Sequence, residues 1–339
     1  MSLPPKEIPL GAMRFNSDSQ KLEYFNGDIW MQIHAFSPNL DGGTRGLFQS
    51  GYVQPAAKDT VDYITIPTAG NATDFGNLAT ARQWATAGWS SNTRAVTVGG
   101  YIAPDVSNQC DYATISTTGN YEDFGDLNDS RVAHAGCSNQ TRGLTCGGNP
   151  ANNSSKTTGC EYMTIASLGM TGASFGDIAT ATASMGGNIQ SPTRSVFFGG
   201  YTPSNVNTIE YFITATLGNA SDFGDLSTIA GDVPMGCSNS IRGLRAGGNA
   251  PSSTDTIDYI TIATSGNAMN FGNLSAVVSS AEGSTASPTR GVFAGIGDPS
   301  SNTIDYVTIA TQGDAVDFGD LYEARTHGNG VSNGHGGLG

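Results

Sequence analysis

The sequence is poor in charge, in lysine and in long apolar runs. Charged residues make up 13% of the 339 residues, about half of the usual ~25%, and the net charge is −14 with only 4 lysines. The basic surface that attracts nucleic-acid phosphates is therefore missing, and no nucleic-acid partner is expected. No apolar run approaches the ~18 residues of a membrane-spanning helix, and residues 1–10 lack the apolar centre of a signal peptide, so no membrane partner is expected.

Cysteine and histidine are also scarce and are not spaced as metal ligands. The cysteines are an odd number without a Cys-x-x-Cys pair, which predicts reduced, buried thiols and neither a disulfide framework nor a zinc site. They are Cys110, Cys137, Cys146, Cys160 and Cys237, and the histidines are His34, His134, His327 and His335. No histidine pairs visibly with a serine or cysteine nucleophile. We therefore expect no enzyme activity, no catalytic residue, no cofactor and no resident metal.

Three markers recur six times at a period of about fifty residues. The first is an arginine that opens a β-pattern: Arg45, Arg94, Arg142, Arg194, Arg242 and Arg290. The second is the tyrosine of an acid–Tyr pair: Tyr63, Tyr112, Tyr162, Tyr211, Tyr259 and Tyr306. The third is the phenylalanine of a Phe-Gly pair: Phe75, Phe124, Phe175, Phe223, Phe271 and Phe318. A fixed period of this length indicates a repeat architecture whose units pack on their neighbours.

Each repeat divides into four short strands, here called a to d. Strand a is short and consists mainly of small residues, as in 85–89, and strand b begins at the repeat arginine, as in 194–201. Strand c carries the acid–Tyr pair, as in 256–263, and strand d carries Phe-Gly, as in 271–274. With 46 glycines, about twice the usual share, the chain suits many tight turns. We predict an all-β, six-bladed β-propeller over residues 41–339, because radial closure leaves no exposed sheet edge.

The first repeat has no convincing strand a, and the end of the chain offers one. The tail from Arg325 to Leu338 contains Ser332-Asn333-Gly334, which aligns with Ser138-Asn139-Gln140 of the third repeat. The C-terminal segment is therefore predicted to form the inner strand of the first blade.

The first forty residues differ from the repeats. Residues 1–10 contain three prolines and are predicted to form an extended arm. Residues 11–33 alternate short apolar segments with turn residues, including Asn26-Gly27, a strong hairpin signal. We expect a small three-stranded meander here, followed by a linker at 36–43. Residues 1–40 thus form a separate N-terminal domain.

The repeat unit resembles the kelch repeat. The likeness rests on Gly199-Gly200 after strand b, Tyr211 in strand c and an aromatic residue in strand d, where Phe223-Gly224 stands in place of the kelch tryptophan. The Thr-Arg-Gly and Asp-Phe-Gly-Asp-Leu units and the His-Gly-Gly-Leu tail are similar to repeat proteins of tailed bacteriophages, especially cyanophages. Met13-Arg14-Phe15-Asn16, Glu23 to Gly27 and Trp30 also resemble a small module of phage tail-fibre and virion proteins.

This resemblance implies a non-enzymatic structural protein of the virion, assembled in the host cytoplasm. Residues 1–40 would dock on other virion proteins, and the propeller would project as a fibre, knob or decoration, with host-surface glycans as candidate ligands. Self-association into a homo-oligomer is left open. The competing hypothesis is a free carbohydrate-binding or carbohydrate-acting protein on a kelch-like propeller.

The partner-facing surface is sought in the loops between strands b and c. These loops differ between repeats, and rigid strands that present unlike loops are typical of a recognition surface, although unrestrained loops also vary. The candidate residues are Pro55, Asp105, Asn152, Ser204, Ser252 and Ser300.

The repeated residues are given structural roles. The six arginines would hydrogen-bond carbonyls or an aspartate of a neighbouring blade, which we favour over an anion-binding ring. The six phenylalanines would fill the gaps between blades while the following glycine permits a bend. The aspartates that flank Phe-Gly, such as Asp222 and Asp225, would cap turns or pair with a repeat arginine, and the alternative is that they bind Ca²⁺.

Overall fold

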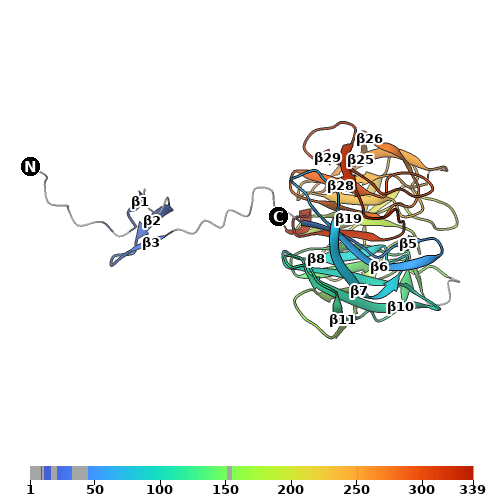
Figure 1. Ribbon diagram of the computed structural model, residues 1–339, viewed down its shortest axis with the longest axis horizontal. Helices are drawn as coiled ribbons and strands as arrows, with labels where there is room; N and C mark the ends of the chain where they lie inside the picture. The colour runs from blue at the N-terminus through green and yellow to red at the C-terminus, as the bar shows by residue number, and fades with distance from the viewer. Residues whose placement is uncertain are drawn as a thin grey trace, which may run out of the picture. The chain divides into compact units, whose positions relative to one another are not determined.

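The computed structural model describes residues 9, 11–16, 21–32, 45–150, 155–249 and 251–338. Within these residues the chain is all β, as predicted, and its only helix is a 3₁₀ turn, η1 (Gly336–Leu338). The chain divides into two units, Met1–Leu40 and Asp41–Gly339 (Figure 1). The predicted N-terminal arm apart from Pro9, the predicted linker and Asn152 lie outside the described residues.

The N-terminal unit contains the predicted meander. Its strands β1 (Met13–Asn16), β2 (Lys21–Phe25) and β3 (Trp30–Gln32) pair antiparallel in the order β1-β2-β3. The hairpin falls where Asn26-Gly27 predicted it, but its loop spans residues 26–29, because Phe25 pairs with Trp30. The Oδ1 of Asn26 closes this loop by accepting hydrogen bonds from the backbone N–H groups of residues 28 and 29.

The second unit repeats one arrangement of strands, which corresponds to the predicted a, b, c and d. The inner strands are β8 (Ala87–Ser90), β13 (Ala135–Ser138), β19 (Gly186–Gln190), β23 (Met235–Ser238), β27 (Gly283–Ala286) and β31 (Asn329–Ser332). The second strands are β4 (Arg45–Gln49), β9 (Arg94–Ile102), β14 (Arg142–Cys146), β20 (Arg194–Phe198), β24 (Arg242–Ala246) and β28 (Arg290–Ala294).

The third and outer strands complete these sheets. The third strands are β6 (Ala56–Thr65), β10 (Asp105–Thr114), β16 (Gly159–Thr164), β21 (Thr208–Ile213), β25 (Thr254–Thr261) and β29 (Thr303–Thr308). The outer strands are β7 (Thr73–Arg82), β11 (Glu122–Asp126), β18 (Ala173–Asp177), β22 (Ser221–Asp225), β26 (Met269–Val278) and β30 (Val316–Asp320). Four shorter strands are β5 (Tyr52–Val53), β12 (Arg131–Val132), β15 (Asn149–Pro150) and β17 (Met170–Thr171).

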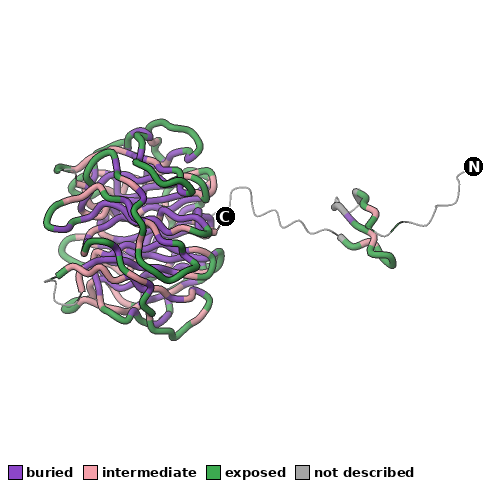
Figure 2. Tube along the Cα trace, turned by 180° about the vertical axis from the view of Figure 1, so that it is seen from behind, coloured by how far each residue is buried: buried purple, intermediate pink, exposed green. Residues whose placement is uncertain are grey.

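The sheets are antiparallel and propeller-like. The orders β13-β14-β16-β18, β19-β20-β21-β22, β23-β24-β25-β26 and β27-β28-β29-β30 contain the predicted four strands in chain order. The sheet β8-β9-β10-β11 has an additional strand, β17, which comes from the next repeat and pairs parallel to β11. Buried residues run through the centre of the unit, and exposed residues follow its loops (Figure 2).

The C-terminal strand joins the first repeat, as predicted. Strand β31 pairs antiparallel with β4, and Ser332 lies opposite Gly46. Ser138 lies opposite Gly143 in the equivalent pair of β13 with β14, so the register follows the sequence alignment. The first repeat therefore consists of β31, β4, β6 and β7, with β5 at its edge.

Each inner strand contacts the inner strand of the next sheet. These contacts run from β8 to β13, β19, β23, β27 and β31, and β31 also contacts β8. Glycines allow the close approach, since a Cβ on Gly136 would lie only 3.0 Å from the carbonyl oxygen of Gly88. A larger residue at this position would push neighbouring sheets apart.

The Phe-Gly pair joins each sheet to the following one. The phenylalanine carbonyl accepts a hydrogen bond from a glycine N–H in the strand c–d turn of the next repeat, and a Cβ on Gly76 would collide with the carbonyl of Gly119. The N–H to carbonyl pairs are Gly119 to Phe75, Gly169 to Phe124, Gly218 to Phe175, Gly266 to Phe223, Gly313 to Phe271 and Gly70 to Phe318. The dipeptide is thus an inter-sheet connection as well as a bend.

We expect Phe271→Ala to lower the free energy of unfolding by roughly 3–5 kcal/mol. Phe271 is 3% exposed and shares a buried cluster with Phe293 and Val307 of the next sheet, so the truncation leaves a cavity between sheets. Denaturant titration measures the change. Val277→Ala is the matched control, because Val277 lies on the same strand and is 46% exposed. A loss no larger than that of the control would contradict the inter-sheet role.

One prediction about the cysteines is wrong. Cys146 and Cys160 form a disulfide, because the register of β14 and β16 places them directly opposite each other. The remaining three, Cys110, Cys137 and Cys237, are buried free thiols, as expected. Burial raises the pKa of the Cys110 thiol to about 12, which keeps it protonated and unreactive.

Candidate functional site

The six repeat arginines are engaged in contacts between neighbouring sheets. Each guanidinium lies over the tyrosine ring of its own repeat, with Cζ 4.4–5.2 Å from the ring centroid. Each Nη1 also donates to a backbone carbonyl of the next repeat. The first acceptors are Ile115 for Arg45, Ile165 for Arg94, Thr214 for Arg142, Ile262 for Arg194, Ile309 for Arg242 and Ile66 for Arg290. An anion bound here would have to compete with these hydrogen bonds.

The acid that precedes each repeat tyrosine is buried between sheets. Asp258, for example, accepts hydrogen bonds from the backbone N–H and the hydroxyl of Ser227 in the preceding sheet. A second set of arginines, which sequence reasoning did not single out, neutralises four of these acids. The ion pairs are Arg82 with Asp111, Arg131 with Glu161, Arg245 with Asp258 and Arg325 with Asp62. The sequence could have pointed to these four arginines, because they do not belong to the six recurring arginine positions.

The aspartates that flank Phe-Gly do not cap turns: Asp222 and Asp225 both lie in the outer strand β22, and the backbone of Asp225 bonds to the next repeat. The backbone N–H of Asp225 donates to the side chain of Asn267, and its carbonyl accepts from the N–H of Ala268. Over the described ranges, no three His, Cys, Asp or Glu side chains gather as metal ligands.

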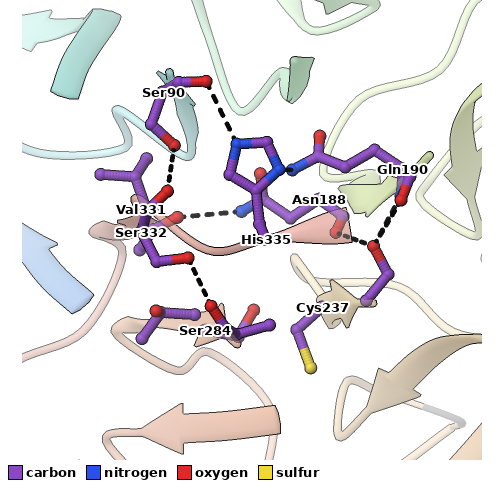
Figure 3. A pocket seen from close by; sticks show the side chains of 12 residues that line it. Ser90, Asn188, Gln190, Cys237, Ser284, Val331, Ser332 and His335 are labelled. Atoms are coloured by element: carbon purple, nitrogen blue, oxygen red, sulfur yellow. Dashed lines mark hydrogen bonds between the residues drawn. The ribbon is translucent and has the colours of Figure 1, made fainter. Parts of the chain in front are cut away.

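The two ends of the inner strands differ. At their C-terminal ends, the tail residue His335 is buried between Ser90 and Gln190 (Figure 3). Its Nδ1 accepts a hydrogen bond from Nε2 of Gln190 at 2.7 Å, and its Nε2 donates to the carbonyl of Ser90 at 3.1 Å. Burial lowers the pKa of His335 to about 4, so the ring is neutral. The cavity beside it measures about 10 Å³, room for about one water, so this end is filled by the chain itself.

The opposite end carries two sets of repeated positions, which we call the open rim. The first set precedes the inner strands and has left-handed backbones with φ of 52–60°: Trp84, Ala133, Ser184, Val233 and His327. Backbone hydrogen bonds connect these positions in series, for example from Ser184 N–H to the Ala133 carbonyl and from Ala133 N–H to the Trp84 carbonyl. Left-handed conformations are unfavourable for residues other than glycine and tend to cluster at functional sites.

The second set of the open rim follows a recurring glycine near the end of the second strand in five repeats. Its members are Tyr52, Tyr101, Asn149, Tyr201 and Asn249, and each forms a β-bridge with a residue one or two positions before the first set, as Tyr201 does with Ala183. The backbone positions are equivalent, but the side chains differ in chemistry. The scaffold therefore presents a tyrosine from three repeats and an asparagine from two at the same place.

One part of the open rim is aromatic. The ring of Trp84 lies 6.2 Å from that of Tyr101 and 5.9 Å from that of His327, measured between centroids. Trp84 and Tyr101 are only half-buried, so this cluster is accessible to a ligand. Burial lowers the pKa of His327, which favours its neutral form, while the carboxylate of Asp232 acts in the opposite direction.

The neighbouring part of the open rim contains a groove of about 500 Å³, within the size range of small-ligand sites. Its lining residues are Asn149, Lys156, Ala183, Ser184, Tyr201, Asn205, Asp232 and Asn249. The Nζ of Lys156 lies 4.5 Å from the centroid of the Tyr201 ring. Three amides, one carboxylate, one ammonium group and an aromatic ring thus converge on a single opening.

The predicted loop residues lie beyond this groove. Pro55, Asp105, Ser204, Ser252 and Ser300 are all exposed, and Ser204 is adjacent in sequence to Asn205. None of them lines the groove, which is formed by residues set back from the loop tips. The recurring position after Gly-Gly was the sequence signal that could have identified Tyr201 and Asn249.

No protein family model matches the chain, and no curated protein matches it either. The described part of the chain contains no helix with the length and apolarity that a membrane crossing requires.

Proposed function

We propose that residues 41–339 form a closed, six-bladed, kelch-like β-propeller. The hydrogen bond from the Phe carbonyl to the Gly N–H of the next repeat supports closure, because the same bond joins Phe318 of the last repeat to Gly70 of the first. The contact of β31 with both β27 and β8 supports it in the same way. In this arrangement the open rim surrounds one end of the central axis, and His335 fills the other.

We infer that the chain is a non-enzymatic structural protein of a tailed-phage virion and that its open rim recognises a ligand on the host surface. The observation that carries this proposal is the contrast between a uniform scaffold and a varied rim. Equivalent backbone positions hold tyrosine at 101 and 201 but asparagine at 149 and 249, and conformational strain is concentrated beside them. Loops and rims that vary on a rigid scaffold are where binding residues concentrate.

The Met1–Leu40 unit is assigned the docking role, with other virion proteins as its partners. Its residues contact one another and form a compact unit distinct from the repeat unit, and it has a small sheet of its own. Three strands of this length are marginal in isolation, which favours packing against a partner. The virion is the proposed location of the assembled protein.

The test compares the full chain with a variant lacking residues 1–40 in the virus that encodes it. Mass spectrometry and antibody labelling of purified particles should find the full chain and not the shortened one. The shortened chain should keep the melting temperature of the repeat unit, which shows that it is folded. Equal amounts of both chains in the particles would remove the docking role, and absence of the full chain would remove the virion role.

The groove of the open rim also suits the competing function, a free carbohydrate-binding propeller protein. That function is favoured if the full chain is absent from particles and still binds glycans in solution. Its carbohydrate-acting version additionally requires turnover of a glycan by the free chain.

A further inference from the structure

The groove of the open rim contains polar groups that have no hydrogen-bond partner among the residues that the structure describes. The Oδ1 of Asn249 is buried and has no hydrogen-bond partner among the described residues. No hydrogen bond or ion pair joins the side chain of Asn149 or Asp232 to another described residue, although the carboxylate of Asp232 acts electrostatically on His327. An amide both donates and accepts, and a carboxylate accepts, so the site suits a ligand that offers several donors and acceptors.

The charges in the groove favour a neutral ligand. Lys156 and Asp232 contribute one charge of each sign, and the ammonium group of Lys156 is already engaged over the Tyr201 ring. The net charge of the chain, −14, would also repel an anionic ligand. A polyanion or an acidic sugar is therefore disfavoured, and a cation would find only one carboxylate.

Aromatic rings add an apolar contact to these polar groups. Tyr201 is 44% exposed and lies in the groove itself. The cluster of Trp84, Tyr101 and His327 follows along the open rim, joined to Ser184 through the backbone of Ala133. Sugar rings carry hydroxyl groups at their edges and C–H groups on their faces. A row of amides beside exposed aromatic rings matches both features.

We propose that the groove binds a neutral saccharide, with one sugar held by the amides beside Tyr201 and an adjoining sugar against the aromatic cluster. This proposal rests on the proposed function in that it identifies the ligand of the open rim. Asp232 and Asn149 receive hydroxyl hydrogen bonds, and the Oδ1 of Asn249 gains the donor that it lacks. The entropic cost of ordering the binding site is small because the backbone hydrogen bonds of the rim hold it in place before a ligand arrives.

The test titrates the full chain with lactose, maltose and N,N′-diacetylchitobiose as neutral probes and with 3′-sialyllactose as the acidic probe, in the presence of a chelator. Saturation-transfer NMR and tryptophan fluorescence report binding, and Trp84→Phe identifies the part of the fluorescence change that arises at the rim. We expect saturable binding of at least one neutral probe, weakened about tenfold by Tyr201→Ala. Tyr322→Ala is the matched control, because Tyr322 is 79% exposed and does not line the groove.

The outcomes separate this proposal from the proposed function. Lack of binding by all three neutral probes, equal binding by Tyr201→Ala, or preference for 3′-sialyllactose would each overturn the neutral-saccharide site. Particles that carry Tyr201→Ala as abundantly as the natural chain, but lose adsorption to host cells, would support it. Failure of the full chain to enter particles bears on the virion role alone, since the titration uses the isolated protein.

Discussion

Deletion of the chain from residue 328 onward is expected to abolish the cooperative unfolding of the repeat unit. The deletion removes β31, the inner strand of the first repeat, and leaves β4 with an unpaired edge. It also removes His335, which fills one end of the inner strands. Circular dichroism and calorimetry should show a broad, low-temperature transition or an aggregated product.

The size of this effect follows from what β31 contributes. Val331 is 5% exposed in a buried cluster, and burial of such a side chain is worth about 1.5–3 kcal/mol. Asn329 donates to the carbonyl of Ala85, Ser332 donates to that of Ala286, and each such hydrogen bond adds about 0.5–1.5 kcal/mol. With the backbone pairing to β4, the sum is comparable to the whole stability of a domain, about 5–15 kcal/mol.

A peptide of residues 325–339 added in trans provides the control. It should pair with the free edge of β4 and restore a cooperative transition, because strand addition reuses the original backbone hydrogen bonds. A peptide with Val331 and Ser332 replaced by aspartate should not do so. If the shortened chain melts at the temperature of the full chain, the pairing of β31 with β4 is not what holds the repeat unit together.

The strand arrangement could be predicted from the sequence because equivalent residues pair with each other in every repeat. The alignment of Ser332 with Ser138 was enough to predict that the C-terminal strand joins the first repeat. The same reasoning could have found the disulfide. Cys146 is the last residue of a second strand, and Cys160 precedes an acid–Tyr pair, two positions that face each other as Ala294 and Ile304 do in a later repeat.

The open rim was harder to predict, because its residues come together from the ends of separate strands. The sequence predicts that loop tips vary, but it does not show that Trp84 approaches His327, which is 243 residues away in the chain. The left-handed backbone at Ser184 also has no signature in its residue type. Exposed tips such as Ser252 are favoured because the loops differ between repeats, whereas the groove is formed by residues set back from the tips, among them Lys156 and Asn205 of the same strand b–c loops.

Arg325→Met is expected to lower the free energy of unfolding by about 3–5 kcal/mol, the range for removal of one partner from a buried ion pair. Arg325 is fully buried, and its Nε donates to Glu282 at 2.7 Å while its Nη1 lies 3.1 Å from Asp62. The substitution leaves the buried carboxyl groups of Asp62 and Glu282 without their cationic partner. Lys58→Met is the matched control, since Lys58 and Glu323 form a partly exposed pair that is worth about 0–1 kcal/mol.

The same group of residues should give stability a defined pH dependence. Burial raises the pKa of Glu282 from 4.5 to about 8. The guanidinium of Arg325 opposes this shift, and the neighbouring Asp62 adds to it. Between these values the folded state holds a proton that the unfolded state has lost, so stability falls as pH rises through this window. Denaturant titrations across it should show that Glu282→Gln flattens the decline and that Arg325→Met is most harmful at the alkaline end. A Glu282→Gln profile parallel to that of the natural chain would show that Glu282 is ionised throughout.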